Sequence, residues 1–516
     1  MRILIISNLL PPRVIGGYEI ACWNIAKGLR ERGHDVVVLT SPTERPITEN
    51  QDFVERSLAM HGYTHPHPTE PHIKEYADYQ SVVSVPDNTR LVLDALRRFR
   101  PDHVIAFNLV GIGSIAIIDL LNAVGVPWTM NLGDRVPNTI TEAVPRDILE
   151  LYGLEDGAAF RLGSHAIISQ TLADEIAAGS IDLGNNVKII SRGIRPSAEK
   201  RGRAYRDGGV SRFNAAGAIS EHKGVGIIVD AAALLRARGI DDFTVDVYGD
   251  GEREEFTRRA AAAGVEEHVR FPGAVQQAEL FRRNASADAF LFPTWPREPF
   301  GSAPLEAAAV GCVPILTSNC GAAERLVDGV DALKVERTAE AFADAMERVI
   351  RGDIDLESFG RAGMERIAGP LSFERSLVEL EEFIASFARP DWADATLDDP
   401  AVATDVLAKN SRGLELLFTE LAIRDIPVVP QRSNGDRARA AARAARDVAL
   451  GGARALVRRA RGETLPPPVD PNAVLIDEMV VSLRLQNEVH RKDNLALRHQ
   501  LGWADAQGDS EMSRRV

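Results

Sequence analysis

Two successive series of short apolar runs that alternate with helical patterns constrain the fold of this chain more than any other feature. The first series consists of β-rich runs and amphipathic stretches at 3–6, 19–32, 36–39, 89–99 and 104–107. Strands that alternate with helices in this way are typical of βαβ units built around a parallel sheet. The first series therefore predicts a doubly wound α/β domain over residues 1–195.

A second series begins after a polar stretch rich in glycine and arginine at 192–212, which is the best candidate for an interdomain linker. Its strand and helix patterns lie at 213–217, 226–237, 243–248, 252–263, 269–271, 289–292 and 313–316. They predict a second α/β domain over 205–370, closed by a helix at 371–388. Two similar halves in tandem imply two Rossmann-like domains that face each other across a cleft.

The composition changes after residue 388, and we interpret 389–516 as a linker followed by a helical C-terminal extension. The segment 437–461 contains eight arginines and is helix-prone. Two interpretations stay open for it, a peripheral contact with an anionic membrane surface and a solubilising helix or tail. The segment 473–501 places apolar residues at heptad-like spacing near its start, which suggests an oligomer contact.

Charge and cysteine content restrict the partners and the compartment. The net charge of -14 argues against a nucleic-acid-binding protein, which needs a basic surface to displace counterions. Three scattered cysteines fit a reducing compartment. No run approaches about 18 consecutive apolar residues, so we expect no membrane span. The expected location is cytoplasmic, with a peripheral position on the inner face of a membrane as the alternative that segment 437–461 leaves open.

Glu298 and Glu306 carry the strongest chemical signal, because seven residues separate them across a strand-to-helix transition. Both side chains can face a ligand held at the start of that helix, where backbone N–H groups favour a diphosphate. Carboxylates also accept hydrogen bonds from sugar and ribose hydroxyls. The alternative is that Glu306 is only an acidic residue in the first turn of a helix.

The neighbourhood of these glutamates bears a family resemblance. The sequence Glu-Pro-Phe-Gly-Ser-Ala-Pro-Leu-Glu at 298–306, with its continuation to 329, resembles the donor-site signature of the family 4 retaining glycosyltransferases of GT-B fold. The likeness extends over roughly residues 1–388. Further matches in the same order are Gly16-Gly17, Lys223-Gly224, Gly249-Asp250-Gly251, Phe271-Pro272-Gly273 and Glu324.

The resemblance implies a retaining hexosyltransferase that moves a sugar from a nucleoside diphosphate sugar to a glycan, a lipid-linked acceptor or another acceptor in polysaccharide or glycoconjugate biosynthesis. It implies no cofactor and no metal. Glu298 and Lys223 are the implied catalytic residues, with Glu298 on the donor sugar hydroxyls and Lys223 on the diphosphate. The implied donor-binding residues are Gly16, Gly17, Gly217, Glu221, Gly249, Phe300, Gly301, Ser302 and Glu306.

Two positions depart from the family pattern. Ala218 stands where the family usually has an arginine, so one of two cations for the diphosphate is missing. Gly133 stands where many relatives carry a histidine, so no histidine is assigned a catalytic role. Three arginines from neighbouring loops are candidates to replace the missing cation, and the sequence does not choose among Arg135, Arg192 and Arg195.

Other interpretations compete with an active transferase. A degenerate, non-catalytic partner that binds nucleotide sugar would explain Ala218 and Gly133, and a nucleotide-sugar epimerase of GT-B fold is a third alternative. Four histidines in a proline-rich loop fit a solvated acceptor-side loop better than a metal site, because their spacing matches no helix or strand face. They are His61, His65, His67 and His72.

Overall fold

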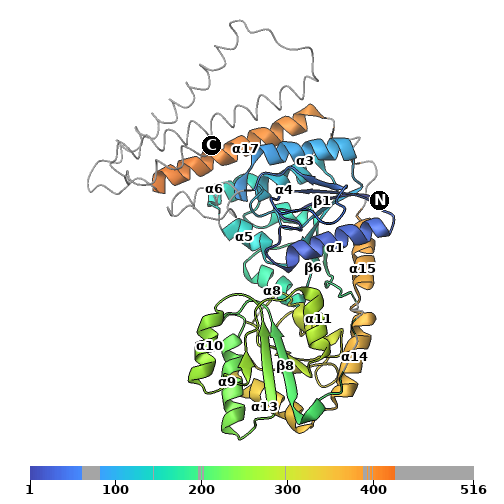
Figure 1. Cartoon of the computed structure of the whole chain (residues 1–516). Helices are drawn as coiled ribbons and strands as arrows, with labels where there is room; N and C mark the ends of the chain where they lie inside the picture. Colours follow the sequence, from blue (N-terminus) through green and yellow to red (C-terminus); the bar gives the residue numbers. More distant parts are fainter. Residues whose placement is uncertain are drawn as a thin grey trace, which may run out of the picture.

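Two parallel β-sheets lie one beyond the other along the long axis of the molecule, each covered by helices (Figure 1). The computed structural model describes residues 1–60, 82–142, 144–195, 199, 201, 203–296, 298–387, 392, 396–397 and 399–424. The predicted architecture of two Rossmann-like α/β domains is confirmed.

The first sheet contains seven parallel strands in the order β3-β2-β1-β4-β5-β6-β7. Its strands are β1 (Arg2–Ile6), β2 (Asp35–Thr40), β3 (Val54–Arg56), β4 (His103–Ala106), β5 (Trp128–Leu132), β6 (Ser164–Ile167) and β7 (Val187–Ile189). Its helices are α1 (Gly17–Glu31), α3 (Pro86–Phe99), α4 (Ser114–Val124), α5 (Val136–Glu142), α6 (Arg146–Tyr152), α7 (Ala158–Arg161) and α8 (Gln170–Ala178). The strand order switches between β1 and β4, where sheets of this kind bind ligands beyond the carboxyl ends of their strands.

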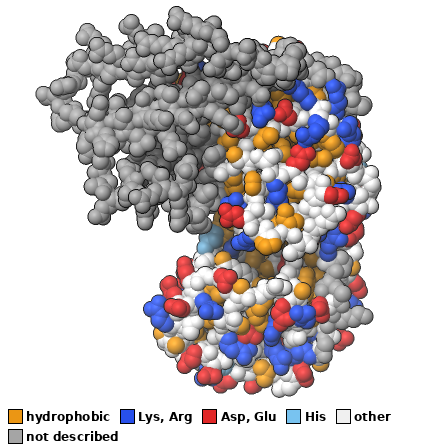
Figure 2. Space-filling view, turned by 45° about the horizontal axis from the view of Figure 1, so that its top comes forward, with side chains coloured by type: hydrophobic (Ala, Val, Ile, Leu, Met, Phe, Trp, Pro, Cys, Tyr) orange, Lys and Arg blue, Asp and Glu red, His pale blue; other side chains and the backbone are white. Residues whose placement is uncertain are grey.

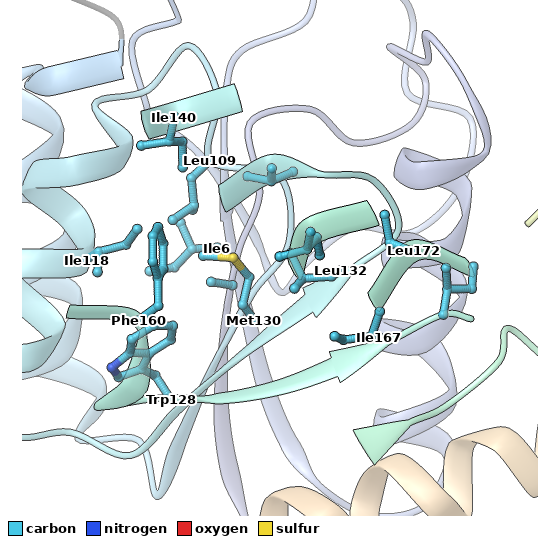
Figure 3. Packing of buried hydrophobic residues seen from close by; sticks show 14 of the residues in the cluster. Ile6, Leu109, Ile118, Trp128, Met130, Leu132, Ile140, Phe160, Ile167 and Leu172 are labelled. Atoms are coloured by element: carbon cyan, nitrogen blue, oxygen red, sulfur yellow. The ribbon is translucent and has the colours of Figure 1, made fainter. Parts of the chain in front are cut away.

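Strands in the middle of this sheet are buried on both faces because helices cover both sides. All four residues of β4 and all four of β6 are buried. Figure 3 shows Trp128 and Met130 of β5 close to Phe160 of α7 and Ile118 of α4. Because both faces are covered, apolar residues such as Ile105 and Ala106 can follow one another along a strand and still be buried.

The second sheet contains six parallel strands in the order β10-β9-β8-β11-β12-β13. Its strands are β8 (Ser211–Ala216), β9 (Phe243–Tyr248), β10 (Val269–Arg270), β11 (Ala289–Phe292), β12 (Val313–Thr317) and β13 (Leu333–Val335). Its helices are α9 (Val225–Ala237), α10 (Arg253–Ala262), α11 (Gln277–Ala285), α12 (Ala303–Ala308), α13 (Ala339–Arg351) and α14 (Leu356–Ala368). The order switches between β8 and β11, so the loops after these two strands flank the crevice.

Helix α15 (Phe373–Ala385) returns from the second domain to the first and packs against α1. At the crossing, Ile194 N donates to Leu371 O at 3.0 Å and Phe373 N donates to Ile194 O at 3.1 Å. Leu377 and Leu380 of α15 join the apolar cluster on the α1 side of the first sheet. The chain therefore connects the two domains twice, once in each direction.

The beginning of the expected C-terminal extension is part of the first domain. Helix α17 (Pro400–Arg424) packs against α4 and α6 (Figure 1). Trp392 Nε1 donates to Pro101 O at 2.8 Å, and Lys409 Nζ pairs with Asp119 at 2.5 Å. Helix α4 is apolar on nearly all sides because α17 covers the face that the sheet leaves free.

Three predictions concern segments outside the described residues. These are the histidine loop with His61, His65, His67 and His72, the arginine-rich segment 437–461 and the segment 473–501. Within the described part of the chain, no helix is both long enough and apolar enough to cross a membrane.

Candidate active site

Lys223 and Glu298 lie in the loops that follow neighbouring strands of the second sheet, and their side chains form an ion pair. Lys223 Nζ donates to Glu298 Oε2. The same oxygen accepts hydrogen bonds from Thr294 Oγ1 at 2.9 Å and from Trp295 Nε1 at 2.8 Å. The Glu298 side chain is only 14% exposed. Three donors therefore hold this carboxylate in one place beside the cation.

Arg337 ties the Lys223 loop to the Glu298 loop. Its Nε donates to Pro293 O at 3.1 Å and to Thr294 O at 3.0 Å. Its Nη2 donates to Glu221 O at 3.0 Å and to His222 O at 3.3 Å. One guanidinium thus satisfies four backbone carbonyls from two loops and fixes their separation.

Sequence reasoning did not identify these supporting residues. Thr294 and Trp295 precede Glu298 by four and three residues, so their closeness in the chain was an available signal. Arg337 lies far along the sequence in a stretch without a motif, so only its contacts in the structure show its role.

Glu306 lies in α12, and Gln277 Nε2 of the neighbouring helix α11 donates to its Oε1 at 3.2 Å. Burial raises the pKa of the Glu306 carboxyl, and hydrogen bonds from Ser302 and Gln277 act in the opposite direction. Ser302 is the N-cap residue of α12, and Gly301 precedes it. Ser302 and Gln277 therefore hold the Glu306 carboxylate at the start of α12, and Gln277 is a neighbour that the sequence did not indicate.

Gly217 and Gly249 end the neighbouring strands β8 and β9 and lie in close contact. Gly217 N donates to Tyr248 O at 3.0 Å. Gly249 has φ of 149°, and a Cβ placed on it would lie 1.8 Å from Gly217 O. Only glycine fits at this position without moving the backbone. Both residues therefore bring bare backbone to the crevice edge of the second sheet.

Two of the predicted donor-binding side chains point elsewhere. Glu221 is exposed and pairs with Arg259 of α10, although its carbonyl contacts Arg337. Phe300 is 4% exposed and packs in the apolar core. In this conformation Phe300 can contact a ligand only through its backbone, and the Glu221 carboxylate is paired with Arg259.

Gly16 and Gly17 stand at the start of α1, beyond the carboxyl end of β1. Glu19 caps this helix start, because its Oε2 accepts from Gly16 N at 2.8 Å and from Ile15 N at 3.2 Å. A Cβ placed on Gly16 would meet no heavy atom within 4 Å, so the surroundings of this residue are open. The glycine loop therefore lies at the switch point of the first sheet.

The first domain contacts the second directly beside the Glu298 loop. Ser169 Oγ donates to Pro299 O at 2.5 Å. Glu324 of the second domain accepts from the backbone N–H groups of Gln170 and Thr171 at 2.8 and 2.6 Å, at the start of α8. Figure 2 shows the surface narrowed and hollowed where the two domains meet. The carboxyl edges of both sheets therefore border one crevice.

Two family models match the chain over these two domains. The model described as glycosyl transferases group 1 matches residues 205–366, and the glycosyl transferase 4-like domain matches residues 16–167. The second domain is therefore a glycosyl transferases group 1 domain, and the first is a glycosyl transferase 4-like domain. This glycosyltransferase has the GT-B fold, and the resemblance inferred from the motifs is confirmed.

Named relatives of this glycosyltransferase include two proteins from Mycobacterium tuberculosis. A glycogen synthase is 26% identical over 397 residues, which cover 72% of this chain and 92% of the relative. A GDP-mannose-dependent alpha-(1-6)-phosphatidylinositol monomannoside mannosyltransferase is 31% identical over 178 residues, 31% of this chain and 44% of the relative.

A solved structure supports the fold. Anabaena Alr3699/HepE in complex with UDP superposes with a TM-score of 0.54 at 17% identity, covering 75% of this chain and 100% of the other.

Proposed function

We propose that this glycosyltransferase transfers a hexose-type sugar from a nucleoside diphosphate sugar to a glycan, a lipid-linked acceptor or another acceptor, with retention of configuration. The proposal requires no metal and no cofactor. The observation that carries it is the Lys223–Glu298 pair, an ammonium and an immobilised carboxylate at the crevice. Relatives support the donor class, since one is GDP-mannose-dependent and another was solved with UDP.

In the proposed reaction, Glu298 accepts hydrogen bonds from donor sugar hydroxyls while Lys223 binds the diphosphate. Thr294 and Trp295 keep Glu298 in place when Lys223 turns to the phosphate. The bond from the anomeric carbon to the phosphate oxygen breaks, and its electron pair leaves with the diphosphate. The acceptor oxygen bonds the same face of that carbon, and its proton passes to the departing phosphate. Lys223 then stabilises the charge that develops on the leaving group.

The nucleoside end of the donor is assigned to Glu306. Its carboxylate is a suitable acceptor for both ribose hydroxyls, and Gln277 and Ser302 orient it from two sides. The Glu298 loop runs directly into α12, which carries Glu306, so one continuous segment spans the sugar and ribose positions.

The test is a thermal-shift and product screen of the full chain against UDP-, GDP- and ADP-linked glucose and mannose. We expect one nucleotide to raise the melting temperature, and Glu306→Ala to abolish that shift. Glu279→Ala is the matched control, because Glu279 is an acidic residue of α11 that pairs with Arg282 and Arg283. NMR of the anomeric proton in the product then reports retention or inversion.

Each outcome separates the alternatives. Binding without any sugar transfer or hydrolysis would favour a non-catalytic partner, and interconversion of the nucleotide sugar without acceptor would favour an epimerase. No stabilisation by any of the six donors would contradict the proposed function.

A further inference from the structure

Arg192 follows β7, and its side chain reaches the carboxyl ends of β1 and β5. Its guanidinium lies over the Tyr18 ring, 5.1 Å from the ring centroid. A Cβ placed on Gly133 would lie 1.9 Å from Arg192 Nη2, and one placed on Gly17 would lie 3.6 Å from Nη1. The guanidinium therefore occupies the space that a side chain at residue 133 would fill.

Two of the three nitrogens of this guanidinium, Nε and Nη2, are buried and have no hydrogen-bond acceptor among the described residues. Burial lowers the pKa of Arg192, while the nearby Tyr18, Glu19 and Asp134 act in the opposite direction without bonding to it. Glu19 instead accepts from the backbone of Ile15 and Gly16. A desolvated cation left without acceptors is costly, so the site favours an anion.

The two other candidate arginines are already engaged. Arg135 pairs with Glu142 at 2.6 Å and with Glu175 at 3.3 Å. Arg195 stacks on Phe373, 4.2 Å from the ring centroid, and lies 3.9 Å from Glu31. Of the three arginines that the sequence left open, only Arg192 presents free donors at the glycine loop of the first domain.

We propose that Arg192 binds the diphosphate of the donor and supplies, from the first domain, the cation that Ala218 does not supply from the second. This inference rests on the proposed function. Gly17 and Gly133 leave space for the guanidinium, and Tyr18 supports it from one face. In the proposed donor orientation Glu306 binds the nucleoside in the second domain, so Arg192 meets the β-phosphate, which carries the sugar. It stabilises that phosphate as the bond to the anomeric carbon breaks.

The test compares nucleoside diphosphates with monophosphates by calorimetry, using UDP, GDP and ADP against UMP, GMP and AMP. Arg192→Gln should bind the preferred diphosphate about 10- to 100-fold more weakly, because a charge-assisted hydrogen-bond pair is lost. Its monophosphate affinity should stay within about twofold. Arg195→Gln, which makes the same charge change in the same loop, should bind both like the wild type.

Two further variants separate a direct contact from a structural effect. Gly133→Ala keeps Arg192 but displaces its guanidinium, so it should reproduce the selective loss of diphosphate affinity. Ala218→Arg added to Arg192→Gln should restore diphosphate affinity, because residue 218 is exposed and can direct a cation into the crevice.

The outcomes distinguish the two proposals. If the wild type binds no diphosphate, the proposed function fails together with this inference. If the wild type binds one and Arg192→Gln binds it equally well, only the role of Arg192 is wrong. A raised acceptor KM with unchanged diphosphate affinity would assign the guanidinium to an anionic acceptor instead and overturn the inference.

Discussion

Charged side chains at the two sheet edges that border the crevice differ in how they are paired. In the second domain Lys223 and Glu298 neutralise each other, and Thr294 and Trp295 complete the hydrogen bonds of the carboxylate. In the first domain, Arg192 Nε and Nη2 are buried and have no hydrogen-bond partner among the described residues. The second domain therefore has an assembled site whose cation must change partners, whereas the first domain has a cation that needs a partner.

This difference indicates a division of work between the domains. In the proposed reaction, the second domain positions the donor through side chains that are already paired, so ligand binding there exchanges one set of contacts for another. The first domain gains its missing acceptors only when an anion enters the crevice. A diphosphate bound in the crevice would thus satisfy Arg192 and release Glu298 from Lys223 together.

We expect the largest effect on the free energy of unfolding at low pH, and we expect it to come from two buried histidines of the first domain. Burial lowers the pKa of His103 to about 3 and that of His165 to about 4. Both imidazoles are neutral in the folded chain but bind a proton near pH 6.5 when unfolded. The unfolded state therefore binds more protons below pH 6.5, and stability falls as the pH falls. Each buried histidine should lower the free energy of unfolding by about 2 kcal/mol at pH 5 relative to pH 8.

Urea unfolding of wild type and His103→Gln at pH 8 and pH 5 measures this effect. Between pH 8 and pH 5, the free energy of unfolding should fall by about 2 kcal/mol less in the variant than in the wild type. In the second domain His268 has a lowered pKa but is only partly buried, so its contribution should be smaller. An equal pH response in both proteins would show that His103 is not buried neutral in the folded state.

The next effect concerns the pair in the second domain. Lys223→Met should lower kcat roughly 100-fold, because one preorganised charge on the leaving group is lost. The melting temperature should hardly change, since Thr294 and Trp295 still donate to Glu298. Initial rates with the donor found in the screen provide the measurement, and Lys334→Met in β13 is the control. A full rate in Lys223→Met would remove Lys223 from the reaction.

The smallest effect concerns the contact between the domains. Glu324→Gln removes the negative charge of a side chain that accepts hydrogen bonds from the first turn of α8. It should therefore lower the free energy of unfolding by about 1 kcal/mol. Differential scanning calorimetry should show the melting temperature lowered by about 2 °C. Glu365→Gln, at an exposed position of α14, is the control. Two separate transitions in Glu324→Gln alone would show that this contact couples the domains more strongly than we expect.

Much of the fold could be predicted because its signals are local in the chain. Buried parallel strands appear as short apolar runs, and the helix expected at 226–237 is observed at Val225–Ala237. Glu298 and Glu306 belong to one loop-helix segment, as their spacing in the sequence predicted. The attachment of α17 was missed, because burial of Trp392 and the Lys409–Asp119 pair depend on partners about 290 residues away.

The sequence by itself determined the two α/β domains and the order of the motifs, because these follow from periodicity and short spacings. It also determined that Lys223 and Glu298 lie in loops and Glu306 in the following helix of the second domain. Only the tertiary structure decided that Arg337 joins the two site loops and that Glu221 turns to Arg259. It also singled out Arg192 among three arginines, because the direction and the partners of a long side chain depend on the residues that surround it in space.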